Sequence, residues 1–241
     1  MNIFITAGNT QTPVDQVRCI TNVFTGKTGS RIAAAAFDRG HRVIFATSHP
    51  EALDEIPTRR VRIEPNFTIE RYRTFEELET IMAKEIGTGH YQAVIHAAAV
   101  NDYHVAGVYE LSQNTAFDPD LLSMVGKPLP ARFIPTGGGK IKGNHRELWM
   151  RLVPAPKLVD KIRNEWKFDG TLVKFKLEVG VGEDELLKIG EASRTHSGAD
   201  WLVANTLDGM NDWAYLIGNG KPAQKVERSQ LANQLLDVIG F

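Results

Sequence analysis

Compact apolar runs alternate with segments of helical periodicity along the first hundred residues of the chain. A run rich in β-branched and aromatic residues that ends in glycine or polar residues is typical of a buried strand, whereas apolar residues repeated every three to four positions predict a helix. These patterns predict strands over residues 2–8, 41–48, 61–66 and 91–100 and helices over residues 28–40 and 74–87. Gly40 is expected to end the first helix and Thr74 to cap the second.

The same patterns return in the last third of the chain. They predict helices over residues 155–166 and 184–196, with Pro156 near the first turn of the former, and strands over residues 171–179 and 199–206. Residues 213–227 are typical of a hairpin that turns at Asn219-Gly220. A closing helix over residues 229–240 is expected to be capped by Ser229 and ended by Gly240.

The segment from Tyr103 to Gly143 differs from its surroundings, because it has few periodic apolar positions and scattered proline and glycine. It is too long to be a passive connector in a compact domain. We therefore predict a single domain over residues 1–241 that carries a functional flap or partner-contacting segment over residues 103–143.

The alternation of strands and helices predicts the fold class. It favours an α/β fold with a Rossmann-like, mostly parallel sheet and helices on both faces, together with the long flap and a C-terminal hairpin. Such sheets bind ligands beyond the carboxyl ends of their strands. Polar or glycine residues follow three of the predicted strands at that edge: Gly8, Asn9 and Thr10, then Thr47 and Ser48, and then Asn101 and Asp102.

Composition narrows the class of protein. With 42% hydrophobic and 24% charged residues and a net charge of −1, the chain is typical of a globular protein and has no global basic field for nucleic acid. One cysteine, Cys19, excludes an intrachain disulfide framework. The N-terminus turns polar too soon for a signal peptide, and no apolar run is long enough to span a membrane. We expect a cytoplasmic protein.

The stretch NVFTGKTGSRIAAAAF, residues 22–37, places glycine, lysine and threonine before a helix, as a phosphate-binding loop does. A Walker loop also needs a glycine five positions before Gly26, where this chain has Thr21, and the segment AGNTQT lacks the glycines of a dinucleotide fingerprint. A helix N-terminus nevertheless favours an anion, and Arg18 and Lys27 add positive charge nearby.

The longer stretch ITAGNTQTPVDQVRCITNVFTGKTG resembles the N-terminal signature of phosphopantothenate–cysteine ligases. The positions that match are Thr6, Gly8, Thr10, Asp15, Val17, Arg18, Ile20, Asn22, Gly26 and Gly29. The segments HAAAVNDY, KIKG, FKLE and VAN are similar to later motifs of the family and follow in the same order. The resemblance extends from residue 3 to residue 206.

The resemblance implies an activity. These ligases join phosphopantothenate to cysteine in coenzyme A synthesis, using CTP or ATP as co-substrate to make an acyl-nucleotidylate. Mg²⁺ is implied as cofactor, held mainly by the nucleotide phosphates, so no metal ligand is assigned in the chain. The resemblance also implies a homodimer with small-molecule substrates and no nucleic-acid or membrane partner. Because the chain begins at the ligase-like strand, the decarboxylase often fused to bacterial ligases is expected to be absent.

The resemblance also implies site residues. Asn22, Arg18 and Lys140 are the expected catalytic residues, and Asn22 and Lys27 are expected to bind substrate. Lys140 follows the glycines 137–139, which can act as a hinge that closes over phosphates. The expected nucleotide-binding residues are Gly8, Thr10, Ala98, Ala99, Val100, Asp102, Lys140, Phe175 and Arg194.

Several positions depart from the family pattern. Asn9 replaces a glycine or proline, Gly143 stands in place of a second lysine, and Thr206 replaces an aspartate. Where the family has triphosphate-binding lysines, this chain offers Arg194 and His196. Arginine can replace lysine with a different geometry, whereas neutral histidine adds little charge.

Two other functions stay open at this point. A nicotinamide-dependent reductase could use a similar sheet, although the glycine fingerprint is missing. A nucleotide-binding regulator could keep the site without the chemistry. Release of pyrophosphate in the presence of CTP, phosphopantothenate and cysteine distinguishes the ligase from both.

Overall fold

The computed structural model describes residues 1–56, 65–113, 115–126, 133–137, 139–218 and 220–241. The chain divides into two compact units. The first, which we call the sheet unit, comprises Met1–Thr10, Asn22–Val100 and Lys157–Phe241. The second, the hairpin unit, comprises Gln11–Thr21 and Asn101–Pro156.

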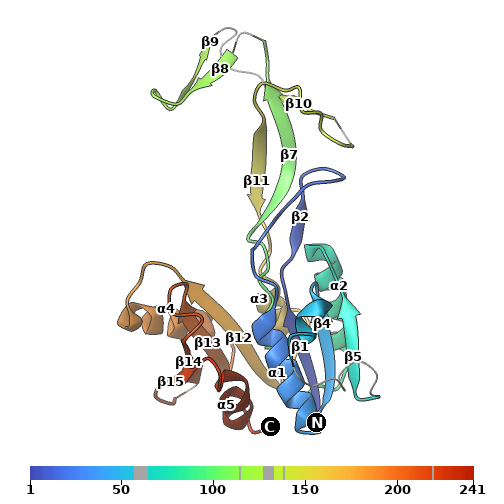
Figure 1. Ribbon diagram of the computed structural model, residues 1–241, viewed down its shortest axis with the longest axis vertical. Helices are drawn as coiled ribbons and strands as arrows, with labels where there is room; N and C mark the ends of the chain where they lie inside the picture. Colours follow the sequence, from blue (N-terminus) through green and yellow to red (C-terminus); the bar gives the residue numbers. More distant parts are fainter. Residues whose placement is uncertain (57–64, 114, 127–132, 138, 219) are drawn as a thin grey trace. The chain divides into compact units, whose positions relative to one another are not determined.

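An eight-stranded sheet forms the centre of the sheet unit (Figure 1). Its order is β15 (Gln224–Glu227), β14 (Trp213–Gly218), β13 (Trp201–Thr206), β12 (Thr171–Glu178), β6 (Ala93–His96), β1 (Asn2–Ala7), β4 (Arg42–Thr47) and β5 (Phe67–Arg71). The six strands from β13 to β5 are parallel, and β14 and β15 pair antiparallel. The predicted α/β fold with a C-terminal hairpin is confirmed.

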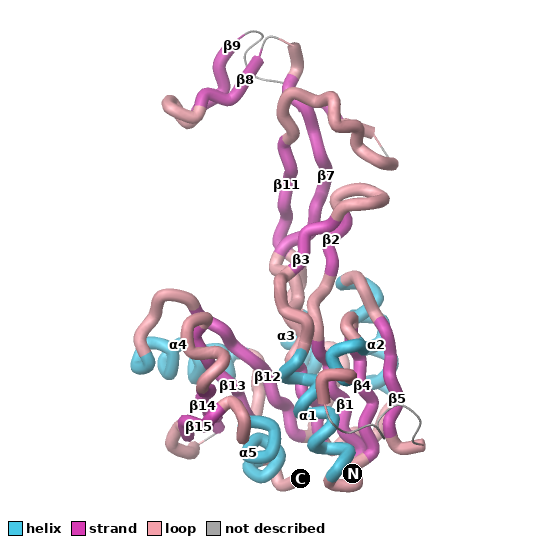
Figure 2. Tube along the Cα trace, in the orientation of Figure 1, coloured by secondary structure: helices cyan, strands magenta, loops and turns pink. Residues whose placement is uncertain are grey.

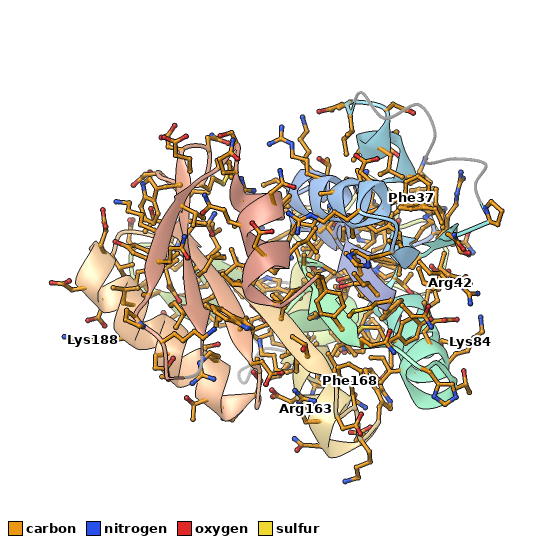
Figure 3. The ribbon with its side chains drawn as sticks, turned by 90° about the horizontal axis from the view of Figure 1, so that it is seen from below. Phe37, Arg42, Lys84, Arg163, Phe168 and Lys188 are labelled. Atoms are coloured by element: carbon orange, nitrogen blue, oxygen red, sulfur yellow. The ribbon has the colours of Figure 1, made fainter. Side chains whose placement is uncertain are left out.

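Helices cover both faces of the sheet (Figure 3). On one face lie α1 (Lys27–Asp38) and α5 (Leu231–Val238), and on the other lie α2 (Phe75–Thr88), α3 (Leu158–Asn164) and α4 (Glu183–His196). A short 3₁₀ helix spans Pro50–Leu53. Side chains alternate along each strand, so Ile3, Ile5 and Ala7 of β1 pack into the core beneath α1 and α5. Among the described residues, no helix combines the length and apolarity needed to cross a bilayer.

Most of the predicted end signals act as expected. Gly40 adopts φ 83° after α1, and its N–H donates to the Phe37 carbonyl. Thr74 caps α2 in a capping box with Glu77. Gly240, with φ 81°, follows the end of α5. These short-range signals need no tertiary contact, which is why they can be read from sequence.

Other boundaries differ from the predictions. Pro156 lies outside α3, whose N-cap is Lys157, and α5 begins at Leu231 with Gln230 as its N-cap, so Ser229 is not the cap. A strand predicted over 61–66 falls largely on residues 61–64, outside the described residues; the observed strand is β5. Asn219 of the predicted hairpin turn also lies outside them.

The hairpin unit consists of small antiparallel sheets (Figure 2). β7 (Tyr103–Leu111) lies between β10 (Phe133–Pro135) and β11 (Trp149–Pro154), and β2 (Gln11–Pro13) pairs with β3 (Cys19–Thr21). β8 (Thr115–Asp118) pairs with β9 (Ser123–Gly126). The sequence pattern missed β7 to β11, because their side chains are mostly part-exposed or exposed and show no alternation of buried and exposed positions.

Candidate functional site

A crevice opens between β6 and β12 on the carboxyl side of the sheet. β6 pairs with β12 only as far as His96 and Lys174, after which β12 continues beside β13 alone. The chain beyond His96 instead follows β1, with the Ala99 N–H donating to the Gly8 carbonyl at 2.7 Å. The observed strand β6 therefore ends at His96, earlier than the predicted range of 91–100, because the residues after His96 no longer pair with β12.

A cavity of about 490 Å³ occupies this region of the sheet unit. It lies where the strand order reverses at β1, the place where doubly wound sheets bind ligands. Its lining residues are Gly8, residues 23–29, residues 97–99, residues 175–177, Asn205, residues 210–211 and Arg228. Of the predicted site residues, Gly8, Lys27, Ala98, Ala99 and Phe175 are thus brought together.

Glycine is required where α1 meets β1. Gly26 has φ 79°, and a Cβ on it would lie 2.3 Å from the Gly8 nitrogen. A Cβ on Gly29 would lie 2.4 Å from the Ala7 Cβ. The close approach places the first turn of α1 against the end of β1. Gly26 is the N-cap and makes no side-chain cap hydrogen bond, so the first N–H groups of α1 have no such acceptor at the cavity.

Asn22 joins two of the segments near the cavity. Its Nδ2 donates to the Ala99 carbonyl at 3.0 Å, and its own carbonyl accepts from Asn9 Nδ2 at 2.5 Å. Asn9 also bridges to Ala99 through the backbone. A glycine or proline at position 9 could not make the side-chain bond, so this departure from the family pattern supports the Asn22 loop.

The buried Asn9 side chain makes further contacts. Its Oδ1 lies 3.3 Å from Ser48 Oγ and 3.2 Å from His49 Nε2. His49 Nδ1 lies 2.7 Å from Glu51, and this hydrogen bond lowers the pKa of the Glu51 carboxyl. The loop after β4 is therefore tied to the loop after β1, a connection that the isolated Thr47-Ser48 pair in the sequence did not reveal.

The opposite wall of the cavity comes from the C-terminal half of the chain. Phe175 is half-buried against the core. Lys176 pairs with Glu178 at 3.0 Å, and Arg228 donates to the Thr28 hydroxyl. Lys176 was not predicted as a site residue although it follows Phe175 in the FKLE segment, because it occupies a position that the motif leaves variable. Met210, Asn211 and Arg228 were not predicted because none of them belongs to a motif.

Three predicted nucleotide-binding residues of the sheet unit do not line the cavity. Thr10 is buried and donates its N–H to the Ala99 carbonyl at 3.3 Å, and Val100 follows Ala99. Arg194 is buried at the end of α4, where it forms two hydrogen bonds to Glu191 and donates to the Ala199 carbonyl at 2.9 Å. Ala199 precedes β13, so Arg194 lies near the amino end of that strand, whereas the cavity is at the carboxyl ends.

The hairpin unit contains two more predicted residues beside each other in space. Arg18 is bound to Asp15 through Nε at 2.9 Å and Nη2 at 2.5 Å, and Nη2 also donates to the Ile141 carbonyl at 2.7 Å. Asp15 in turn accepts from the Ile141 N–H at 3.1 Å. Ile141 is buried, and Lys140 beside it is exposed. We call the three residues Asp15, Arg18 and Ile141 the clamp.

The hydrogen bonds of the clamp change the ionisation of Asp15. The Arg18 guanidinium first, and the backbone N–H of Val17 next, lower the pKa of this carboxyl well below its usual range. Its side chain is 1% exposed. The first motif of the sequence and the KIKG segment are thereby joined across more than a hundred residues.

Asp102 also belongs to the hairpin unit. It is exposed immediately before β7, and its carbonyl accepts from the Ala155 N–H at 2.8 Å. Its neighbour Asn101 donates through Nδ2 to Thr12 Oγ1 at 2.9 Å and to the Ile20 carbonyl at 3.1 Å. These contacts attach the β2–β3 hairpin to the segment that carries Asp102.

A row of buried polar residues crosses the centre of the sheet behind the cavity. Thr6, His96 and Lys174 are register partners on three adjacent strands, and Thr6 Oγ1 lies 2.8 Å from His96 Nδ1. Burial, and then the nearby Lys174 charge, lower the pKa of His96 to about 4. Lys174 donates to the Ser193 carbonyl at 3.1 Å, and burial lowers its pKa. Among the described residues, no three or more histidine, cysteine or acidic side chains are grouped to hold a metal.

Comparison with known proteins places the chain in a family. Residues 1–122 match the model of the DNA/pantothenate metabolism flavoprotein C-terminal domain, which is about half of the chain. The chain belongs to this family. The resemblance to phosphopantothenate–cysteine ligases is thereby confirmed at the level of the family.

Relatives within the family cover nearly the whole chain. The coenzyme A biosynthesis bifunctional protein CoaBC of Thermococcus kodakarensis is 28% identical over 98% of this chain, which spans 50% of the length of that relative. Phosphopantothenate–cysteine ligase 2 of Oryza sativa subsp. japonica is 24% identical over 98% of this chain and 78% of its own.

Solved structures agree on the fold. The DNA/pantothenate metabolism flavoprotein from Streptococcus pneumoniae superposes with a TM-score of 0.77 at 25% identity, covering 99% of this chain and 98% of its own. A Cab2 variant in complex with phosphopantothenate-cysteine superposes with a TM-score of 0.69 at 17% identity over 99% of this chain and 84% of its own.

Proposed function

We propose that this chain is a phosphopantothenate–cysteine ligase. It forms the amide bond between 4′-phosphopantothenate and cysteine, and CTP or ATP activates the carboxylate. The carboxylate attacks the α-phosphorus and releases pyrophosphate; the cysteine amine then attacks the acyl carbon and expels the nucleoside monophosphate. The family membership, and a relative whose name states this ligase activity, support the proposal.

One observation carries the proposal beyond family membership. The cavity at the carboxyl edge of the sheet joins the family motifs of the sheet unit, which are far apart in the sequence: Gly8, the start of α1, Ala98 with Ala99, and Phe175. Its small residues leave room for a ligand, and the N–H groups of α1 favour phosphate oxygens. An apolar wall beside these donors suits a nucleobase and a phosphate chain in one cavity.

Asn22 is the proposed contact of the acyl-nucleotidylate. Its bond to the Ala99 carbonyl and its support by Asn9 hold the side chain beside the residues that line the cavity. A neutral amide offers both a donor and an acceptor to the intermediate, whose charge lies on the nucleotide phosphate. Preorganised donors of this kind stabilise developing charge most effectively.

Mg²⁺ belongs to the proposal as a partner of the nucleotide. None of the described residues that line the cavity carries a carboxylate. Mg²⁺ is bound in such sites by substrate phosphates together with few protein ligands. The available donors, mainly amides and hydroxyls, therefore fit an ion held by the phosphates, and the ion would neutralise phosphate charge during activation.

Residues of the hairpin unit enter the proposal through their motifs. Arg18 and Lys140 are the proposed cationic residues, and Asp102 is the proposed contact of the nucleotide ribose. The clamp supports part of this assignment, because it orders the backbone on one side of Lys140. The proposal also includes the homodimer that the resemblance implies.

The decisive experiment measures turnover. Purified protein is mixed with 4′-phosphopantothenate, cysteine, Mg²⁺ and either CTP or ATP, and pyrophosphate and the amide product are quantified. The ligase releases one pyrophosphate for each amide, and the more active nucleotide identifies the co-substrate. Nucleotide binding without pyrophosphate release would favour the regulator, and oxidation of NADH or NADPH supplied in a parallel assay would favour the reductase.

A variant tests the assignment of Asn22. Asn22→Asp replaces a donor with a carboxylate that faces the Ala99 carbonyl and repels the nucleotidylate. We expect Asn22→Asp to slow amide formation more than it lowers the free energy of unfolding. An unchanged rate of amide formation would contradict the role given to Asn22.

A further inference from the structure

Arg228 occupies an unusual electrostatic position in the sheet unit. It lies in the connection between β15 and α5, where its N–H donates to the Asp212 carbonyl at 2.8 Å. Its guanidinium donates to the hydroxyl of Thr28 in the first turn of α1 and lines the cavity. Because the Thr28 oxygen accepts this bond, the hydroxyl proton remains available to another acceptor.

The other cations of the cavity are neutralised, whereas Arg228 is not. Lys27 pairs with Glu55 at 2.9 Å and Lys176 with Glu178 at 3.0 Å. Within the part of the chain that the structure describes, no carboxylate pairs with Arg228. A half-buried guanidinium without a counter-ion is costly, since burial removes water that would otherwise stabilise the charge.

A second arginine adds to the positive charge. Arg31 lies one turn further along α1 and, among the described residues, has no carboxylate partner either. Burial, and then repulsion from Arg31, lower the pKa of Arg228. Two neighbouring arginines without a shared acid raise the potential at the point where they meet, and an anion would relieve it.

A second cavity connects the two arginines. This cavity, of about 340 Å³, is lined by residues of α1 and the start of α5, including Arg31. It shares Thr28 and Arg228 with the first cavity, so the guanidinium of Arg228 lies at the junction of both. Arg39 also lines this second cavity, but it forms an ion pair with Asp237 at 2.8 Å. The acidic residue Asp38, at the C-terminal end of α1, lines the cavity as well.

We propose that Arg228 and Arg31 bind a phosphoryl group of a substrate at the junction of these cavities, with the Thr28 hydroxyl as a further donor. A guanidinium offers paired N–H groups that match two oxygens of one phosphoryl group. The inference rests on the proposed function for its ligand, since both the nucleotide and 4′-phosphopantothenate carry phosphoryl groups. The arginine pair, rather than the helix terminus alone, sets the position.

The test measures binding directly and needs no turnover. Inorganic pyrophosphate is titrated into the full chain by calorimetry, with Arg228→Gln, Arg31→Gln and Lys188→Gln as variants. We expect Arg228→Gln to weaken pyrophosphate binding by about tenfold or more, as for the loss of a charged hydrogen bond, with a smaller loss for Arg31→Gln. Lys188→Gln removes the same charge from the exposed surface of α4 (Figure 3) and should leave binding nearly unchanged.

Two further titrations identify the source of the phosphoryl group. If the phosphoryl group belongs to the nucleotide, Arg228→Gln weakens the binding of CTP or ATP and leaves the binding of 4′-phosphopantothenate unchanged. If it belongs to 4′-phosphopantothenate, the same variant weakens the binding of 4′-phosphopantothenate and leaves that of the nucleotide unchanged. Arg228→Lys keeps the positive charge but loses the paired N–H groups of the guanidinium, so we expect an intermediate affinity. This variant replaces Arg228→Gln in the test if the glutamine variant fails to fold.

Failure of this inference is distinguishable from failure of the proposed function. Wild-type protein that binds none of these ligands, or arginine variants that bind all of them as wild type does, would overturn the phosphoryl site. Weakened binding in the arginine variants without amide formation by the wild type would keep the site and reject the ligase.

Discussion

The two units of this protein are stabilised in different ways. In the sheet unit the strands and helices bury large side chains completely, among them Phe4, Phe45 and Leu172. In the hairpin unit, Ile141 and Ala155 are the buried apolar residues among those described. The large apolar residues of that unit that are exposed include Leu121, Leu122, Phe133, Ile134, Met150 and Leu152.

The difference teaches which interactions position each set of proposed site residues. Burial of apolar surface, the dominant favourable term in folding, holds the cavity of the sheet unit. In the hairpin unit, backbone pairing and the hydrogen bonds of the clamp take a larger share. Exposed hydrogen bonds and few buried apolar contacts mark regions of low local stability. The hairpin unit should therefore open before the sheet unit unfolds.

The largest expected effect compares two leucines. Leu172→Ala removes a fully buried side chain of β12 and should lower the free energy of unfolding by ~2–5 kcal/mol. Leu152→Ala makes the same truncation on β11, where the side chain is 45% exposed, and should cost less than about 1 kcal/mol. Urea denaturation of both variants checks this. Equal losses would remove the contrast between the units.

A second prediction separates catalysis from stability. Lys140→Ala in the hairpin unit should raise the barrier to amide formation by about 2–4 kcal/mol, as when other preorganised charge stabilisers are removed. The exposed side chain contributes little to folding, so the free energy of unfolding should stay close to that of wild type. The measurement is kcat/KM under the ligase assay, with Lys188→Ala as the control. A rate like that of the control would reject the role of Lys140.

A third prediction concerns acid sensitivity of the sheet unit. The pKa of buried His96 is lowered from 6.5 to about 4, so between these values the unfolded state binds a proton that the folded state does not. Stability is therefore fully present above pH 6.5 and falls as pH drops toward 4, by about 3 kcal/mol in total at ~1.4 kcal/mol per unit.

Replacement of His96 tests this pH dependence. His96→Gln should flatten the curve of unfolding free energy against pH between those limits, even if it lowers stability throughout. His90→Gln, at an exposed position, should leave the curve unchanged. A slope that persists in His96→Gln would show that other groups cause it.

The smallest change in stability is expected when the clamp of the hairpin unit is broken at Asp15. The lowered pKa of Asp15 means that the clamp contributes above the usual range of a carboxyl and is lost only as pH falls below about 4. Asp15→Asn should mimic this loss at neutral pH. In this variant, amide hydrogen exchange of Val17, Arg18 and Ile141 should become faster, whereas exchange in the sheet unit should not change. The control variant Asp120→Asn, at an exposed position, should leave the exchange of these three amides unchanged.

Short-range patterns explain why much of the sheet unit could be predicted. Gly40 and Thr74 act through bonds to residues three or four positions away, so their effect does not depend on the rest of the fold. The apolar run of β1 is buried on both faces, which makes it continuous and easy to recognise. The family motif likewise marked Asn22 before its contact with Ala99 was visible.

Long-range contacts explain what the sequence analysis missed. Strand β6 is shorter than the predicted strand because β12 stops pairing with it after Lys174 and continues beside β13. No local sequence pattern marks the end of this pairing. Arg194 matched a family position by order along the chain, but its contacts with Glu191 and Ala199 lie away from the cavity. Arg228 belongs to no motif, and only the tertiary structure, through its bond to Thr28 and its place in the cavity lining, marks it as a site residue.

The sequence by itself determined the α/β class, the main strands and helices and the family, because these depend on local periodicity and on one contiguous motif. The tertiary structure decided which of the marked residues share a cavity, that Asn9 supports Asn22, and that Arg18 binds the backbone beside Lys140. The physical reason is that these contacts join residues far apart in the sequence; the two hydrogen bonds alone span 13 and 123 positions. Their partners are chosen by packing of the whole chain, which short-range preferences do not encode.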